Sequence, residues 1–309
     1  MNKLHYAVIG SGGIGGFYGG FLAKAGKQVD FLFHSDYEHV VQHGLQIDSP
    51  LGDFHLPQVS AFHSTQDMPP CDVILVGLKT TNNHLLKTLL PPLLKPETLV
   101  ILIQNGFGLE EDLLKEFPSL NLAAGLAFIC SQKSSDGHIT HLDYGKLTLA
   151  AYNQLAEPIV ARVAEDMRQA GLEVEHAPDL ASARWKKLVW NVPFNGSTVV
   201  LDTTTKQLVD NPDTYQLMYD LMKEVMTGAN ACGIKYPIEE SFIQAMLEMT
   251  KKMTPYSPSM KLDYDNHRPM EIDYIYTRPL QTAQQAGVDM KKIAMLEKLL
   301  RFKAIGTVK

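Results

Sequence analysis

Cysteine is scarce in this chain, which has only Cys71, Cys130 and Cys232 among its 309 residues. The number is odd and the spacing is wide, so the sequence predicts neither a disulfide framework nor a metal site. We expect each of the three to be a small, buried, apolar side chain.

Long apolar runs and an excess of positive charge are also missing. No segment approaches the roughly 20 uninterrupted apolar residues that a membrane-spanning helix requires. The net charge of −6 argues against nucleic acid or an anionic membrane surface as a partner. The first residues, Met1–His5, lead straight into an apolar run and do not resemble a secretory signal. We therefore expect a cytoplasmic protein.

A glycine cluster near the N-terminus is the most informative local pattern. It follows the apolar run Tyr6–Ile9 and precedes a helical stretch of small residues. In this context the first glycine permits a sharp turn, the second lets the backbone approach a pyrophosphate, and the third lets the helix pack on the sheet. The N–H groups at the start of the helix favour phosphates. The pattern predicts a nicotinamide dinucleotide as cofactor. The residues predicted to bind it here are Gly10, Ser11, Gly12, Gly13, Ile14 and Gly15.

The end of the second predicted strand bears on the choice of cofactor. An NAD site usually has Asp or Glu there, which accepts hydrogen bonds from the ribose 2′-hydroxyl. This chain has His34 and Ser35 instead, and Asp30 lies at the beginning of the strand. Because no carboxylate would repel a 2′-phosphate there, the sequence favours NADP (NADPH). NAD stays an alternative, since a neutral histidine holds phosphate less firmly than arginine does.

Short apolar runs alternate with helical patterns through the first half of the chain. The runs 71–77, 98–103 and 122–128 are apolar throughout, as strands buried on both faces of a parallel sheet must be. Residues 83–90 and 109–116 are predicted to be the crossover helices between them.

The pattern becomes helical from Pro178 onward, where Asp179 is a good N-cap residue. A chain of 309 residues is also long for one hydrophobic core. We therefore expect an α/β protein, with a Rossmann-type doubly wound parallel sheet in residues 1–177 and an all-helical domain in residues 178–309.

A polar stripe in the second domain is the candidate for chemistry. Lys187, Asn191 and Asn195 have the spacing i, i+4, i+8, so one helical face would present an ammonium and two amides. Taken alone, Lys187 would more often be a solvated lysine beside Lys186. Pro193 lies in the same segment and is expected to kink or end the helix, because it removes one helical hydrogen bond.

Five motifs occur in order over nearly the whole chain. They are the glycine turn, Leu78-Lys79, Gln104–Gly106, Lys187–Asn191, and Ser259-Met260 followed by Glu271–Ile275. This ordered set resembles the ketopantoate reductases. The resemblance implies NADPH-dependent reduction of 2-dehydropantoate to pantoate, a step of pantothenate and coenzyme A biosynthesis. It also implies a Rossmann domain and a helical domain with the active site in the cleft between them.

The resemblance implies roles for single residues. Lys187 matches a general acid that polarises the ketone oxygen and delivers a proton, and Glu271 matches a carboxylate that binds the substrate hydroxyl and positions the lysine. Asn105 and Lys79 match residues beside the nicotinamide and the substrate, at the carboxyl ends of strands. The positions matched to substrate contacts are Asn191, Asn195 and Ser259.

Several positions depart from the family pattern. His34 stands where an arginine commonly holds the 2′-phosphate. The other departures are Lys261-Leu262 for Leu-Gln, Met270 for Thr, and Tyr276-Thr277 for Asn-Gly.

The departures leave alternatives open, because shared catalytic groups do not fix a substrate. One is a reductase of another branched 2-oxo acid. A second is a 3-hydroxy-acid dehydrogenase-like enzyme, which would lack the pair Ser259 and Glu271 at this spacing. A third is a non-catalytic NADP(H)-binding sensor, which would have no reason to keep Lys187 and Glu271 together. The apolar, Met-rich helical domain also suggests a homodimer.

Overall fold

The computed structural model describes residues 3–253 and 257–305, which divide into two compact units. The first contains the described residues up to Gln104 together with Leu109–Leu180. The second contains Asn105–Gly108 and the described residues from Ala181 onward. A single boundary along the sequence does not describe this division, because a four-residue segment of the first half belongs to the second unit.

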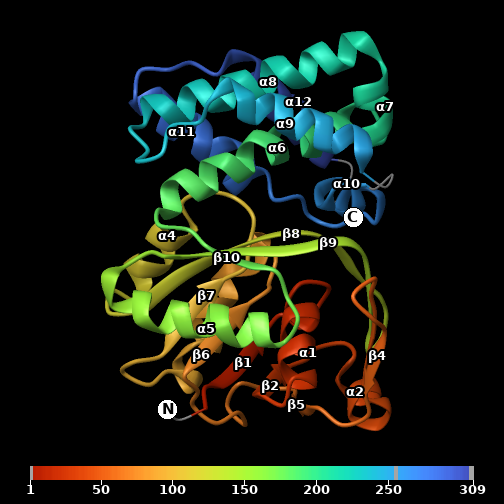
Figure 1. Cartoon of the computed structure of the whole chain (residues 1–309), viewed down its shortest axis with the longest axis vertical. Coiled ribbons are helices and arrows are strands. Elements are labelled where there is room, and N and C mark those ends of the chain that lie inside the picture. The colour runs from red at the N-terminus through yellow and green to blue at the C-terminus, as the bar shows by residue number, and fades with distance from the viewer. Residues whose placement is uncertain (1–2, 254–256, 306–309) are drawn as a thin grey trace. The chain divides into compact units, whose positions relative to one another are not determined.

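The first unit is built on one sheet of ten strands, in the order β4-β3-β9-β8-β7-β6-β1-β2-β5, with β10 paired to β9 (Figure 1). Neighbouring strands from β8 to β5 are parallel, and β9 is antiparallel to β8. The strands are β1 His5–Ile9, β2 Gln28–Leu32, β3 Leu45–Asp48, β4 Phe54–Leu56, β5 Ser60–Phe62, β6 Val73–Val76, β7 Leu99–Leu102, β8 Asn121–Ser135, β9 His138–Ala151 and β10 Val174–His176.

The chain winds outward from β1 in both directions, as a doubly wound sheet requires. All residues of β6 and β7 are buried, which is why these strands read as continuous Val, Ile and Leu. The predicted α/β class with a parallel sheet is confirmed. The short strands β3, β4 and β5 were not expected, since three or four residues give too little periodicity to be recognised.

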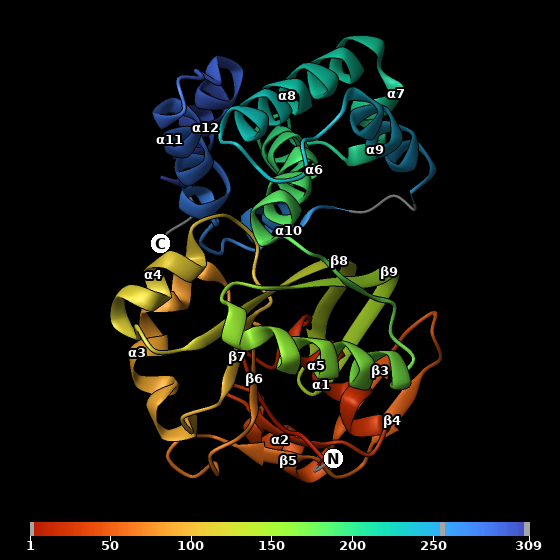
Figure 2. The same cartoon turned by 60° about the vertical axis from the view of Figure 1, so that its left-hand side comes forward.

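Helices cover both faces of this sheet. The helices α1 and α5 pack together on one side, and α3 and α4 lie on the other (Figure 2). The helices are α1 Gly15–Lys24, α2 Tyr37–His43, α3 Leu86–Leu89, α4 Leu109–Glu116 and α5 Glu157–Gln169, with short 3₁₀ turns at Thr80–Leu85, Pro91–Leu93 and Gln154–Ala156.

The crossover helix predicted at residues 83–90 is not a regular α-helix. A 3₁₀ segment, Thr80–Leu85, leads into the single turn α3, and the chain then enters a second 3₁₀ turn at Pro91. Pro91 and Pro92 have no N–H, so neither can donate the next α-helical hydrogen bond, and α3 does not extend past Leu90.

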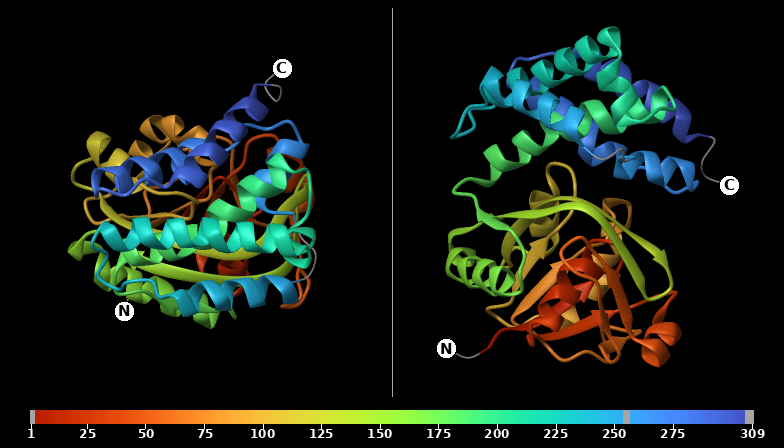
Figure 3. Two further views of the ribbon diagram at one scale, coloured as in Figure 1. Left: turned by 90° about the horizontal axis from the view of Figure 1, so that it is seen from above. Right: turned by 45° about the vertical axis from the view of Figure 1, so that its right-hand side comes forward.

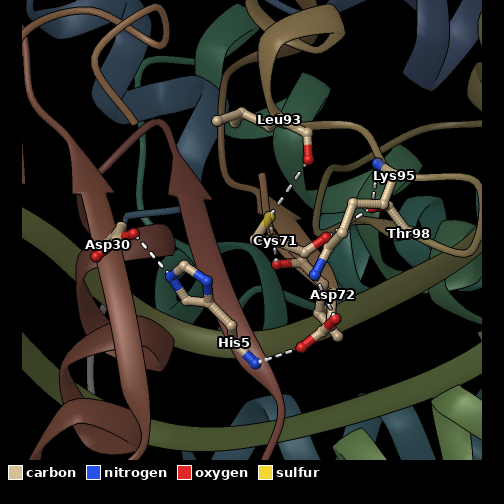
Figure 4. Close-up of polar contacts among 8 residues, drawn as sticks. His5, Asp30, Cys71, Asp72, Leu93, Lys95 and Thr98 are labelled. Carbon is tan, nitrogen blue, oxygen red and sulfur yellow. Dashed lines mark hydrogen bonds and ion pairs between the residues drawn. The ribbon is translucent and has the colours of Figure 1, made fainter. Parts of the chain in front are cut away.

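Polar contacts connect neighbouring strands of the sheet near their amino-terminal ends (Figure 4). The buried Asp30 carboxylate lies 2.7 Å from His5 Nε2. Asp72 accepts a hydrogen bond from the backbone N–H of His5 at 2.9 Å and pairs with Lys95 at 2.7 Å. Thr98 donates to the carbonyl of Cys71 at 2.6 Å. These contacts tie β1, β2 and β6 together at the end opposite the glycine turn.

The second unit is helical, and no strand occurs among its described residues. The helix α8 packs against α7, α9, α11 and α12 (Figure 3). Its helices are α6 Leu180–Val200, α7 Thr205–Asp210, α8 Pro212–Ala231, α9 Glu240–Lys252, α10 Ser259–Asp265, α11 Arg278–Gln285 and α12 Lys291–Ala304, with a π-helix at Asp273–Thr277. This arrangement confirms the predicted all-helical second part.

Helix α6 does not end at Pro193, as the sequence allowed, but continues to Val200. A proline inside a helix costs about 3 kcal/mol. Every residue from Leu188 to Val199 is buried, and this burial offsets the lost hydrogen bond. Tertiary packing has therefore outweighed the local preference.

In the described parts of the chain, every helix is too short or too polar to cross a membrane. All three cysteines are free. Burial raises the pKa of both Cys71 and Cys130 to about 12, so these two thiols stay protonated at neutral pH.

Candidate active site

The glycine turn lies where the strand order reverses, directly after β1 and beside the end of β6. Gly10 has φ +88°, and a Cβ added to it would lie 2.6 Å from the backbone nitrogen of Leu78. A Cβ on Gly15 would collide with the carbonyl oxygen of Gly10. Both glycines are therefore required by the fold itself. Open α/β sheets bind their ligands at this switch point.

Gly12 differs from its neighbours. Its φ is not positive, and a Cβ added to it would meet no atom within 4 Å. Among the glycines that the structure describes, it alone has neither a conformational nor a packing reason to be glycine. A bound pyrophosphate would need such an open position, because it must approach the backbone closely.

Hydrogen bonds hold the turn in place. Ser11 Oγ donates to the carbonyl of Leu32 at the end of β2, at 2.9 Å. Ser131 Oγ of β8 donates to the carbonyl of Gly13 at 2.8 Å. Ile14 occupies the N-cap position of α1, so the turn leads directly into the helix N-terminus that attracts phosphate.

Residues 31–35, at the end of β2, include no carboxylate, and Asp36 is the first one after the strand. Asp30 is buried against His5, toward the other end of the strand. His34 is exposed, and its ring stacks on that of His63, with centroids 6.1 Å apart and planes inclined by 20°. His63 follows β5, the neighbour of β2, and sequence reasoning did not select it.

Lys79 follows β6, where it is the N-cap residue of the 3₁₀ segment Thr80–Leu85. Gln104 fixes this region, because its amide donates to the carbonyl of Leu78 at 2.8 Å and to Asn83 Oδ1 at 2.7 Å. Gln104 was quoted only as part of a motif, and the structure gives it a specific role in joining the ends of β6 and β7.

The catalytic candidates gather in the helical unit. Burial, followed by the positive charge of Arg184, lowers the pKa of Lys187 to about 7, while the negative charge of Glu271 acts in the opposite direction. Glu271 is only 4% exposed and lies directly before the π-helix segment. Arg184 is buried one helical turn before Lys187 on α6. Sequence reasoning missed it, although its i, i+3 spacing from Lys187 was a usable signal.

The two asparagines of α6 have different surroundings. Asn191 is 6% exposed, and its Nδ2 has no hydrogen-bond partner among the described residues. A buried amide donor without a partner is costly unless a ligand supplies one. Asn195 is fully buried, and its Oδ1 accepts from the backbone N–H of Met260 at 3.3 Å. This bond fixes the start of α10, where Ser259 is the first residue.

The loop that carries Asn105 belongs to the same helical unit. A Cβ on Gly106 (φ +108°) would lie 2.5 Å from the Cβ of Tyr274. The backbone N–H of Phe107 donates to the Tyr274 carbonyl at 2.9 Å, and its ring lies 5.1 Å from that of Trp185. The loop thus packs on segments adjoining both Glu271 and Lys187.

Two departures from the family pattern form internal contacts of this unit. Lys261 is 7% exposed, and its ammonium pairs with Asp202 at 2.9 Å and with Asp265. The hydroxyl of Tyr276 donates to the carbonyl of Val192 at 2.8 Å and accepts from the N–H of Gly196. The Tyr276 hydroxyl is therefore inserted between these two backbone groups and replaces the i→i−4 hydrogen bond that they would otherwise form in α6.

The sheet with its glycine turn, followed by a helical unit with buried polar residues around Lys187, is typical of one class of protein. This class is the nucleotide-dependent oxidoreductases with a Rossmann-type sheet and a helical second unit. Residues 6–154 match the family model described as ketopantoate reductase PanE/ApbA, and residues 179–304 match the model of its C-terminal part. The chain therefore belongs to the ketopantoate reductase family.

The similarity of the chain to individual proteins supports this assignment. The chain is 46% identical to a 2-dehydropantoate 2-reductase of Nostoc sp., over 98% of this chain and 96% of that protein. The crystal structure of 2-dehydropantoate 2-reductase from Geobacter metallireducens superposes with a TM-score of 0.94 and 36% identity, covering 97% and 99% of the two chains. The ternary structure of D-mandelate dehydrogenase with NADH and anilino(oxo)acetate shares the fold, with a TM-score of 0.89, 20% identity, and coverage of 98% and 99%.

Proposed function

We propose that this protein reduces 2-dehydropantoate to pantoate with NADPH, as a 2-dehydropantoate 2-reductase. The family match over both units and the 46% identity to a relative of that name support the reaction. The observation that carries the chemistry is Lys187, whose pKa is lowered to about 7 and which interacts with the buried Glu271. A general acid is most effective when its pKa lies near the working pH.

Each catalytic candidate has a distinct task in this proposal. When bound, NADPH supplies a hydride to the substrate. The ammonium of Lys187 polarises the ketone oxygen and gives it a proton, so the product is an alcohol rather than an alkoxide. Glu271 accepts a hydrogen bond from the substrate hydroxyl, and its charge favours the protonated form of Lys187.

Neutral donors orient the substrate. The amide Nδ2 of Asn191 is available to a substrate oxygen, and Ser259 can donate its hydroxyl. Asn195 fixes the backbone at Met260 and thereby the position of Ser259. Asn105 lies on the loop that packs against Tyr274, and it binds the substrate or the nicotinamide.

The cofactor is proposed to bind along the glycine turn. The N–H groups of residues 10–15 hold the pyrophosphate, and Lys79 and His34 contact other parts of the cofactor. NADPH is preferred over NADH because residues 31–35, at the end of β2, include no carboxylate that would repel a 2′-phosphate. A neighbour of the same fold that binds NADH keeps NADH as the competing assignment.

We also propose a cytoplasmic homodimer. Met295, Leu299 and Phe302 lie on one face of α12 and are 57%, 41% and 74% exposed. Their spacing of i, i+4, i+7 suits packing against another helix.

The reaction is tested by the loss of NADPH absorbance with a panel of 2-oxo acids. We expect 2-dehydropantoate to react much faster than its deoxy analogue 2-oxo-3,3-dimethylbutanoate, by up to about 10⁴-fold, because the analogue leaves Glu271 unpaired. Equal rates for the two compounds would favour a reductase of another branched 2-oxo acid.

The variant Lys187→Ala tests the mechanism. We expect kcat to fall by about 10²–10⁴-fold while the Kd of NADPH stays nearly unchanged. Lys186→Ala is the matched control and should keep its activity. A Lys187→Ala protein with more than about a third of the wild-type turnover would remove Lys187 from the mechanism.

A further inference from the structure

A lysine from a distant strand reaches the end of β2. The Nζ atom of Lys133, near the carboxyl end of β8, lies 3.4 Å from Ser35 Oγ. It also lies 3.2 Å from Asp36 Oδ2 and 3.6 Å from Asp136 Oδ1. Ser35 is the third residue after β2, close to where a Rossmann fold binds the adenosine ribose.

The path of β8 connects the two ends of a dinucleotide site. Ser131 donates to the carbonyl of Gly13, and the Cα of Gln132 lies 2.7 Å from where a Cβ of Gly13 would be. Two residues later, Lys133 contacts Ser35. Residues 131–133 therefore run from the turn that faces the pyrophosphate to the place that faces the adenosine ribose.

The neighbouring carboxylates fix Lys133 without covering it. The side chain of Asp36 is only 6% exposed, and its Oδ2 accepts from the backbone N–H of Gly137 at 3.4 Å. The Asp36 carboxylate is thus held inward. Lys133 is 30% exposed and has three N–H donors, so it can bind an anion from the solvent side. The side chain of Asp136 is 58% exposed and can turn away into solvent.

We propose that Lys133 and Ser35 bind the 2′-phosphate of NADPH, in place of the arginine that the family commonly has at position 34. This inference rests on the proposed function, because it assigns the cofactor preference of the same enzyme. His34 precedes Ser35 in the chain and its ring stacks on that of His63, and these two exposed rings can supply further N–H donors. The recognised group is a phosphate monoester on the ribose, which NADH lacks.

The test is a comparison of cofactor affinities for the full chain without substrate. Isothermal titration gives Kd for NADPH and NADH, and also for the fragments 2′,5′-ADP and 5′-ADP. For Lys133→Met we expect the Kd of NADPH and of 2′,5′-ADP to rise by at least about 10-fold, since a charge-assisted hydrogen bond is lost. The Kd of NADH should change by less than about 2-fold, which also shows that the variant is folded.

Two further variants sharpen the result. Lys133→Arg should keep the preference for NADPH, because arginine also binds phosphate. Lys146→Met, on the adjacent strand β9, removes a lysine that pairs with Glu175 and should leave both affinities unchanged. If Lys133→Met weakens NADPH and NADH equally, or neither of them, the inference is wrong.

The outcomes separate this inference from the proposed reaction. A wild-type protein that binds NADH at least as tightly as NADPH overturns the assignment of Lys133, whatever the substrate is. A protein that prefers NADPH through Lys133 but does not reduce 2-dehydropantoate overturns the proposed substrate and keeps the inference.

Discussion

Gly12 and Gly10 differ in what the fold requires of them. The protein itself would accept a side chain there, whereas Gly10 has a positive φ and contacts Leu78. The only group that a methyl at position 12 would displace is one that approaches from outside the protein. Gly10 is thus required by the fold, whereas the proposed cofactor is the reason we give for Gly12.

The variants Gly12→Ala and Gly10→Ala should therefore fail in different ways. For Gly12→Ala we expect a Tm close to that of the wild type and a Kd of NADPH at least about 10-fold higher, because the methyl blocks the pyrophosphate. For Gly10→Ala we expect a lower Tm, since the fold excludes the new Cβ. Thermal unfolding without cofactor and titration of NADPH measure the two effects. A Gly12→Ala protein with unchanged affinity would contradict a pyrophosphate at this turn.

The pKa of Lys187 predicts how activity depends on pH. Above a pKa of about 7 the amine has lost its proton and cannot act as an acid, so kcat/KM for reduction should fall as the pH rises through this value. The charge of Glu271 raises this pKa. In Glu271→Gln the fall of kcat/KM with rising pH should therefore occur at lower pH than in the wild type, in addition to any loss of rate. The pH profiles of both proteins test this.

A remote carboxylate provides the control for the pH profile. Asp210 pairs with Lys206 on the exposed face of α7. In Asp210→Asn, kcat/KM should therefore fall at the same pH as in the wild type. If kcat/KM of Glu271→Gln falls at the same pH as that of the wild type or at a higher pH, Glu271 does not act on Lys187.

At the scale of elements, the π-helix contacts α6, the helix that carries Lys187, through a hydroxyl inserted into its hydrogen bonds. Tyr276 is completely buried, and its hydroxyl bridges Val192 and Gly196 on α6. A Cβ on Gly196 would lie 2.6 Å from this hydroxyl, so Gly196 has to be a glycine. The bridge lies directly beside Asn195 and one turn beyond Asn191.

Removing this hydroxyl should destabilise the helical unit. Tyr276→Phe leaves a buried carbonyl and a buried N–H without a partner, and each such group costs about 1–3 kcal/mol. Tyr236 is 40% exposed, and Tyr236→Phe is the control that should change little. Urea unfolding of both variants gives the comparison. Equal stabilities would mean that α6 closes its own hydrogen bond when the hydroxyl is absent.

The elements divide into those that the sequence predicts and those that it does not. The apolar runs 71–77 and 98–103 locate β6 and β7, because full burial leaves a local signature. The insertion of Tyr276 into α6 has no such signature, since it joins residues far apart in the chain. For the same reason, no local pattern indicates that Lys133 lies beside Ser35, or that Gln104 holds Leu78.

The residues proposed for the site follow a similar division. Lys187, Asn191 and Asn195 could be grouped from helical spacing alone. Glu271 and Ser259 were selected only through family resemblance, because nothing local distinguishes them from ordinary helix-start residues. Their proximity to α6 depends on how the helices pack, which the local pattern does not contain.

At the scale of the whole molecule, the proposed dimer predicts a change in mass. Sedimentation should give twice the chain mass of 34.4 kDa for the wild type. In Phe302→Glu the measured mass should shift toward that of the monomer, because a charge on the exposed face of α12 opposes apolar packing. Leu155→Glu, at a similarly exposed position of the first unit, is the control that should stay dimeric. A monomeric wild type would contradict the proposal.

The segment Asn105–Gly108 has a consequence for how the chain folds as it is synthesised. It leaves the ribosome with the first half of the protein, yet its partners Trp185 and Tyr274 are made much later. The Phe107 ring therefore has no aromatic partner until Trp185 has been synthesised. Domains generally fold as units in the order of their synthesis, so we expect this early segment to take its final place only when the helical unit folds.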